Sequence, residues 1–135
     1  MKSDELKKEI DFATQNLESD YSCGLFQNPS ILVTKEIKQF ARDNPNSRAA
    51  IGIASHDDYW IDQGDRDFVR GKHNAKNRST LVTQILVARE IYRPEAADFE
   101  IYRKRDTKDF GFNLALSLNP HIAITVSRLM EELVR

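Results

Sequence analysis

Positively charged side chains gather in two short clusters of the sequence, and their types and spacing fit binding chemistry best. One cluster precedes an apolar segment over residues 79–92, and the other follows it. Lysine and arginine bind the phosphate groups of DNA and RNA, so two such clusters on one face would form a polyanion-binding surface. The candidate nucleic-acid-binding residues are Arg70, Lys72, Lys76 and Arg78 in the first cluster, and Arg103, Lys104, Arg105 and Lys108 in the second.

The overall charge of the chain hides this arrangement. The 135 residues include 20 basic and 21 acidic side chains, for a net charge of -1. Residues 1–65 hold seven Lys or Arg against twelve Asp or Glu, whereas residues 66–135 hold thirteen against nine. The second half is therefore expected to contact a polyanion. If about six of its cations met phosphates, the logarithm of the affinity would fall with the logarithm of the salt concentration with a slope of about -5.

The acidic first half suggests a different function. Small domains whose charge is polarised in this way can act as inhibitors, immunity proteins or adaptors, because opposite charges select a partner. Oppositely charged faces also permit two copies of a chain to associate, which leaves a homodimer open. A protein-protein interaction module is therefore the alternative to nucleic-acid binding.

The polar stretch over residues 56–78 holds the third kind of chemistry. It has no apolar period, and its histidine and carboxylates are groups that divalent metals and general acid-base sites use. These residues are His56, Asp57, Asp58, Asp62, Asp65 and Asp67. A His-Asp pair also occurs in the metal-binding motif of HD-type phosphohydrolases, which need further ligands, and the only other histidines are His73 and His121. A small metal-dependent hydrolase is thus the third candidate function. The favoured interpretation of the stretch is a turn capped by its own aspartates.

Other catalytic and cofactor motifs are absent from the sequence. There is no glycine-rich phosphate loop, no serine in a nucleophile elbow and no Cys/His spacing of a zinc site. Residues 57–68 do not follow the ligand pattern of a calcium loop. Cys23 is the single cysteine and cannot form an internal disulfide. The residues therefore favour a non-enzymatic protein with no catalytic residue, no metal and no cofactor.

Apolar periodicity and capping residues predict about four helices. Leu6, Ile10, Ala13 and Leu17 follow a helical spacing and would form one apolar stripe. Asn-Pro pairs precede two other apolar runs, and such pairs often start helices. The predicted helices span residues 3–19, 29–43, 79–92 and 120–134.

Two other segments are typical of β-strands. Residues 48–55 are short and apolar, and Gly52 disfavours a helix there. Residues 112–118 alternate strictly in hydrophobicity, and the stretch that starts at Phe99 alternates well enough to pair with them. A hairpin over residues 99–118 is therefore predicted, with the second basic cluster at its tip.

The predicted fold is α+β, a single domain over residues 1–135 in which a small antiparallel sheet packs with about four helices. A helix followed by a basic hairpin is the arrangement with which winged-helix proteins hold DNA, although the helix over residues 79–92 has few exposed base-reading side chains. Tyr102 beside the cations suits stacking on single strands, whereas Phe110 and Phe112 are expected in the core.

Composition places the chain among globular proteins, because 40% of the residues are hydrophobic and 30% are charged. No segment approaches the roughly 20 apolar residues of a membrane span, and the start of the chain lacks a signal-peptide pattern. We therefore expect a cytoplasmic protein without membrane contact. Its predicted function is non-enzymatic binding of DNA or RNA through the basic clusters at residues 70–78 and 103–108.

Overall fold

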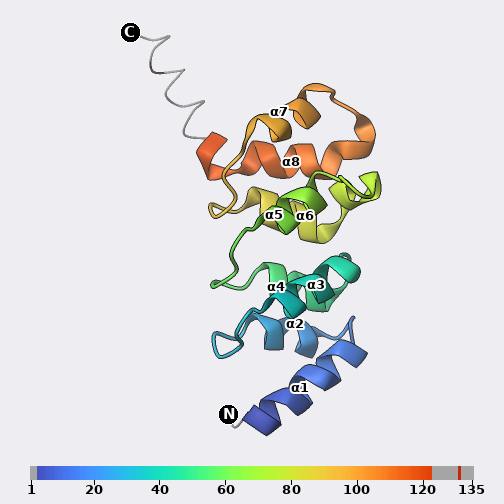
Figure 1. The fold of residues 1–135 in the computed structure, drawn as a ribbon, viewed down its shortest axis with the longest axis vertical. Helices are drawn as coiled ribbons and strands as arrows, with labels where there is room; N and C mark the ends of the chain where they lie inside the picture. Colours follow the sequence, from blue (N-terminus) through green and yellow to red (C-terminus); the bar gives the residue numbers. More distant parts are fainter. Residues whose placement is uncertain (1–2, 123–130, 132–135) are drawn as a thin grey trace. The chain divides into compact units, whose positions relative to one another are not determined.

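The computed structural model describes residues 3–122 and residue 131. Every regular element in this part of the chain is helical, with eight α-helices and two short 3₁₀ helices (Figure 1). Contacts between the elements divide the chain into two compact units, Met1–Trp60 and Ile61–Arg135. No helix among the described residues is long and apolar enough to cross a membrane. The expectation of a single domain stays a prediction.

The first unit contains α1 (Ser3–Gln15), α2 (Asp20–Gln27), α3 (Lys35–Asp43) and α4 (Arg48–Ala54). Helix α4 packs against both α2 and α3, and α1 packs against α2. The side-chain oxygens of Ser19, Thr34 and Ser47 accept hydrogen bonds from the first-turn backbone N–H groups of α2, α3 and α4. These N-caps explain where the three helices begin.

Helices α2 and α4 pack closely against each other at Gly52. A Cβ atom at this position would lie 2.3 Å from the backbone oxygen of Cys23 on α2. That distance is shorter than van der Waals contact, so the two backbones pack this closely only because Gly52 has no side chain. Ala49, Ala50 and Ala54 are fully buried in the same helix.

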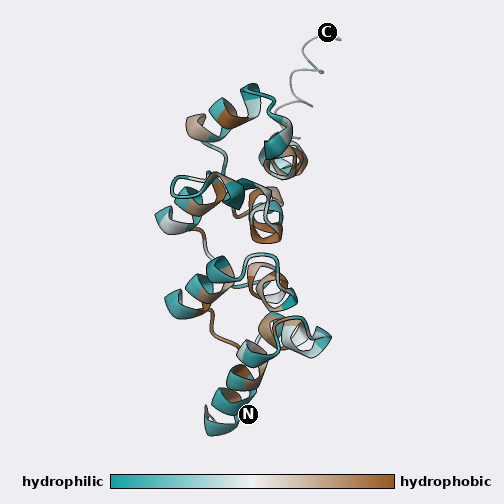
Figure 2. Cartoon of the chain, turned by 90° about the vertical axis from the view of Figure 1, so that its right-hand side faces the viewer, coloured by the Kyte–Doolittle hydropathy of each residue, from teal (hydrophilic) through white to brown (hydrophobic). Residues whose placement is uncertain are grey.

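The second unit contains α5 (Gln63–Val69), η1 (Ala75–Ser79), α6 (Leu81–Ala88), α7 (Ala96–Arg103), η2 (Thr107–Asp109) and α8 (Phe110–Leu118). Helix α6 packs along α8, and Val82, Leu86, Phe112 and Leu116 from this pair are fully buried. Figure 2 shows hydrophobic and hydrophilic residues on different faces of the helices, as expected for helices that bury one side.

Asn119 closes the end of α6. Its fully buried side-chain Nδ2 donates to the backbone oxygens of Val87, Arg89 and Tyr92, at 2.8, 3.1 and 2.8 Å. Its Oδ1 accepts from the backbone N–H of His121 at 2.9 Å. One amide therefore satisfies carbonyl groups that the end of a helix leaves without partners.

The predicted strand over residues 48–55 is wrong, because this segment is helix α4. Short apolar segments fit a buried strand and a buried helix equally well by periodicity. Here Ser47 caps a helix, and Gly52, which seemed to disfavour one, serves the close approach to α2.

The predicted hairpin over residues 99–118 is also wrong, and with it the basic hairpin tip, because α7, η2 and α8 occupy this segment. The alternation in residues 112–118 arises from two faces of one helix. Phe112 and Leu116 point into the core, whereas Leu114 and Leu118 are 44% and 64% exposed. The described residues form an all-α structure without strands, and the α+β fold class is corrected accordingly.

The predicted helices are displaced at their ends. The helix predicted over residues 3–19 divides into α1 and the capped start of α2, and that over 29–43 begins only at Lys35. The helix predicted over 79–92 is α6, shortened at both ends. The helix predicted over 120–134 lies mostly outside the described residues. The polar stretch over residues 56–78 contains α5 and η1 and is not a long irregular loop.

Lys38 is fully buried on α3, which is rare for lysine. Its Nζ donates to the backbone oxygen of Trp60 at 3.0 Å. The same ammonium lies 4.1 Å from the centre of the Trp60 ring and 5.1 Å from that of Tyr59. Lys38 therefore connects α3 to the end of the first unit through a hydrogen bond and two cation-π contacts.

Replacing this ammonium should destabilise the first unit. For Lys38→Met, which keeps the apolar stem, we expect the free energy of unfolding to fall by roughly 2 kcal/mol, because the Trp60 oxygen loses a charged donor. Urea denaturation followed by the fluorescence of Trp60, the only tryptophan, measures the loss. Lys35→Met, on the exposed side of the same helix, is the control and should change stability by less than about 0.5 kcal/mol. Equal midpoints for both variants would contradict the assigned role.

Candidate nucleic-acid interface

All eight predicted cations lie in the second unit, on short elements and the turns between them. Arg70 follows the last residue of α5, Lys76 and Arg78 lie on η1, and Lys108 lies on η2. The others are Lys72 in the turn after α5, Arg103 at the end of α7, and Lys104 and Arg105 directly after it.

Arg70 forms ion pairs within the second unit. Its Nε donates to Oδ1 of Asp98 at 2.9 Å and its Nη2 to Oδ2 at 3.0 Å, a two-point ion pair. Its Nη2 also donates to Oε1 of Glu95 at 2.8 Å. The Arg70 side chain is 15% exposed and that of Asp98 is fully buried. The hydrogen bond to Asp98 is the main cause that raises the pKa of Arg70 above its already high ordinary value.

Asp98 accepts further hydrogen bonds in addition to those from Arg70. The Tyr92 hydroxyl donates to Oδ1 at 2.6 Å, and the backbone N–H of Glu95 donates to Oδ2 at 2.8 Å. Burial, followed by the hydrogen bond to Asp98, raises the pKa of the Tyr92 hydroxyl. The hydrogen bond from Arg70 lowers the pKa of Glu95.

Arg78 also forms an ion pair within the second unit. Its Nε donates to Oδ1 of Asp109 at 2.6 Å, and its Nη1 donates to the backbone oxygen of Arg70 at 3.1 Å. The Asp109 side chain is only 5% exposed. Gly71 has a positive φ of 69°, and a Cβ there would lie 2.8 Å from Nη1 of Arg78, so this turn is shaped to receive the guanidinium.

The other six predicted cations are exposed: Lys72, Lys76, Arg103, Lys104, Arg105 and Lys108. Lys72 lies closest to an acid, with its Nζ 3.7 Å from Oδ2 of Asp67 and its side chain 63% exposed. These six side chains are exposed to solvent, whereas Arg70 and Arg78 make ion pairs within the second unit.

The two basic clusters meet at a hollow between η1 and η2. It has a volume of about 360 Å³, and Lys76 and Arg78 line it from the first cluster while Lys108 lines it from the second. Asp106 and Asp109 complete its charged lining. Since Asp109 is already paired with Arg78, the remaining charges are two lysines and one aspartate. The structure thus brings together residues that lie about thirty positions apart in the sequence.

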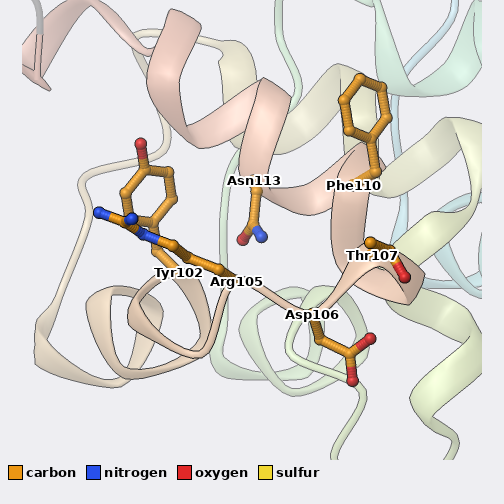
Figure 3. Close-up of a pocket in the computed structure, with 6 residues that line it drawn as sticks. All are labelled: Tyr102, Arg105, Asp106, Thr107, Phe110 and Asn113. Carbon is orange, nitrogen blue, oxygen red and sulfur yellow. The ribbon is translucent and has the colours of Figure 1, made fainter.

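A second hollow of about 280 Å³ adjoins the first, because Asp106 lines both. Tyr102 and Arg105 line it on one side, and Thr107, Phe110 and Asn113 complete it (Figure 3). In Figure 3 the amide of Asn113 points from α8 into the space beside Arg105 and Tyr102. Arg105 has a φ of 50°, a left-handed conformation that costs a non-glycine residue on the order of 1–2 kcal/mol.

Sequence reasoning missed part of this second hollow. Phe110 was expected in the core but is 68% exposed, whereas Phe112 is buried as expected. Tyr102, expected to be available for stacking, is 40% exposed. Asn113 has no sequence signal at all, yet its Oδ1 is buried and accepts no hydrogen bond from the described residues.

The histidine and aspartates of the acidic stretch after α4 make hydrogen bonds within the fold. His56 is buried, its Nε2 donates to the backbone oxygen of Asn28 at 2.9 Å, and its Nδ1 accepts from the backbone N–H of Asp58 at 3.0 Å. Asp62 and Asp65 cap the start of helix α5 reciprocally. In the part of the chain that the structure describes, no three His, Cys, Asp or Glu side chains are placed to hold a metal ion.

Removing the charge of Asp98 should destabilise the second unit strongly. Asp98→Asn keeps the shape but leaves the guanidinium of Arg70, in a largely buried place, with only the exposed carboxylate of Glu95 as its partner. We expect the free energy of unfolding to fall by about 3 kcal/mol, as for other buried pairs that lose one partner. Urea denaturation followed by circular dichroism measures this change. Glu100→Gln, on an exposed site of the same helix, is the control, and a loss no larger than that of the control would refute the role of Asp98.

Tyr92 should make stability depend on alkaline pH. Because the pKa of its hydroxyl is raised in the folded state, the stabilisation is fully present below the ordinary tyrosine pKa near 10 and is lost as the pH rises towards the folded value. The stability advantage of the natural chain over Tyr92→Phe should therefore be constant from pH 7 to 9 and shrink above pH ~10. Denaturation midpoints of both chains across this range test it, and a constant advantage up to pH ~11 would count against it.

Comparison of the chain with protein-family models, with curated proteins and with solved structures finds no match. The assignment of a function to this interface therefore relies on its own residues. Those residues offer exposed cations at one hollow and exposed aromatic rings at the next.

Proposed function

We propose that the second unit binds DNA or RNA through its six exposed cations, without catalysing a reaction. The observation that carries this proposal is the hollow between η1 and η2, where Lys76 from the first basic cluster and Lys108 from the second line the same space. Convergence of cations from separate elements is what a phosphate backbone requires, because each contact displaces condensed counterions and adds to the affinity.

The buried ion pairs support the proposal by fixing the platform that carries these cations. Arg70 joins α5 to α7, and Arg78 joins η1 to the start of α8, so the turns that present Lys72, Lys76 and Lys108 have defined positions. Side chains on a fixed platform lose less entropy on binding than those on a mobile tail. The exposed aromatic rings of Tyr102 and Phe110 next to the cations favour nucleic acid over a simple polyanion.

Binding should depend steeply on salt and on two lysines. With up to six phosphate contacts, the log-log slope of affinity against salt should approach -4 for a single strand and -5 for a duplex. The double variant Lys76→Ala/Lys108→Ala should bind more weakly and flatten the slope by about 1.5, because two contacts are lost. Fluorescence anisotropy of labelled oligonucleotides across a salt series measures both quantities.

Two matched variants make this test specific. Lys7→Ala/Lys8→Ala removes the same charge from exposed positions of α1 in the first unit and should leave affinity and slope unchanged. Asp106→Asn removes the acid shared by the two hollows and should strengthen binding. Absence of binding at low salt, or equal loss with both lysine pairs, would overturn the proposal.

A protein partner is the second candidate function. Phe110, Leu114 and Leu118 repeat every four residues along α8, and their exposed fractions are 68%, 44% and 64%. Such a stripe is typical of a helix face that packs against another apolar surface. Leu114→Ser/Leu118→Ser would weaken association with a protein, and it should not affect oligonucleotide binding through the lysines.

A further inference from the structure

The hollow beside the cations differs in chemistry from the hollow between η1 and η2. Arg105 and Asp106 contribute opposite charges to its lining, so it offers no net attraction to a phosphate. The rest of the lining is two exposed aromatic rings, a hydroxyl and an amide. Such a surface suits a flat, uncharged group with hydrogen-bonding edges, and a nucleobase is the group of that kind that accompanies phosphates.

We propose that this hollow holds one unstacked adenine of a single-stranded DNA or RNA, contacted by the amide of Asn113 and the rings of Tyr102 and Phe110. This inference rests on the proposed function, since the cations of the neighbouring hollow would hold the phosphates on either side of the base. The volume of about 280 Å³ lies just below the usual range for small-ligand pockets, which fits a single base rather than a stacked pair.

Asn113 provides the reason to name adenine. Its Oδ1 is buried and receives no hydrogen bond from the described residues, and an acceptor in that condition is costly to the folded protein. Asparagine pairs with adenine at two points, because Oδ1 accepts from the exocyclic amino group while Nδ2 donates to the ring nitrogen N7. The last torsion of an asparagine side chain is soft, so the amide can turn towards the opening of the hollow at low cost.

The aromatic rings provide the remaining contact. Tyr102 at the end of α7 and Phe110 at the start of α8 are both exposed, and both line the hollow. Bases stack on exposed aromatic side chains in single-strand-binding proteins, and double-stranded nucleic acid cannot offer a base in this way. The hollow therefore predicts a preference for single strands over duplexes.

The test compares oligonucleotides that differ only in the group that Asn113 would read. Inosine carries an oxygen in place of the exocyclic amino group of adenine, so its edge with N7 presents two acceptors and the amide can no longer make both hydrogen bonds. We expect an eight-residue oligoadenosine to bind about tenfold more tightly than the matching oligoinosine, in both the DNA and the RNA series. Duplex DNA of the same length should bind with the salt dependence of the cations alone.

Variants assign the preference to this hollow. Asn113→Leu keeps the size of the side chain and removes the orphaned acceptor, so the protein should fold at least as stably while the preference for adenine over inosine disappears. Tyr102→Ala and Phe110→Ala should each weaken single-strand binding by about fivefold or more. Phe12→Ala, which removes an exposed ring of the first unit, is the matched control and should leave binding unchanged.

The outcomes separate this inference from the function on which it rests. If the natural chain binds adenine and inosine oligonucleotides equally and with the expected salt slope, the adenine pocket is refuted and the nucleic-acid proposal stands. If no oligonucleotide binds at low salt, both fail. A preference for adenine that survives Asn113→Leu would also overturn the assignment, because another residue would then read the base.

Discussion

The second unit depends on one buried carboxylate. Asp98 is fully buried and receives four donors, two from Arg70, one from the Tyr92 hydroxyl and one from the backbone of Glu95. A buried charge is tolerated only when it is paired and its remaining lone pairs are satisfied, and this arrangement meets both conditions. Because Arg70 directly follows α5 and Asp98 belongs to α7, the pair also connects segments that are 28 residues apart. The pair therefore holds the end of α5 against α7, the helix that ends at Arg103.

Basic residues that look alike in the sequence have different environments in the structure. Arg70 and Arg78 belong to the first basic cluster with Lys72 and Lys76, yet the two arginines point inward and the two lysines outward. Arginine suits the inward role because its guanidinium holds a carboxylate at two points and stays charged when partly buried. The partners of both arginines lie 28 and 31 residues away, so neighbouring residues give no indication of the pairing.

Local signals predicted helices well where a clear apolar period ran over several turns. The helical stripes assigned to residues 3–19 and 79–92 correspond to α1 and α6, with errors at the ends. The same approach failed at residues 48–55 and 112–118, because short apolar runs satisfy strand and helix patterns alike and only tertiary packing decides between them. The candidate cations were identified from charge alone, whereas Asn113 is polar without any distinctive neighbour and became a candidate only through its burial.

Asn119 shows how a neighbouring residue can protect an interaction chemically. Its Nδ2 donates to three backbone oxygens at the end of α6, so conversion to aspartate would exchange a donor for a further acceptor among those oxygens. Asparagine usually deamidates when the backbone nitrogen of the next residue attacks its side-chain carbonyl. Here the next residue is Pro120, whose backbone nitrogen has no hydrogen and cannot follow that route. Pro120, at the predicted start of a helix, thus also preserves, over the lifetime of the protein, the amide that closes α6.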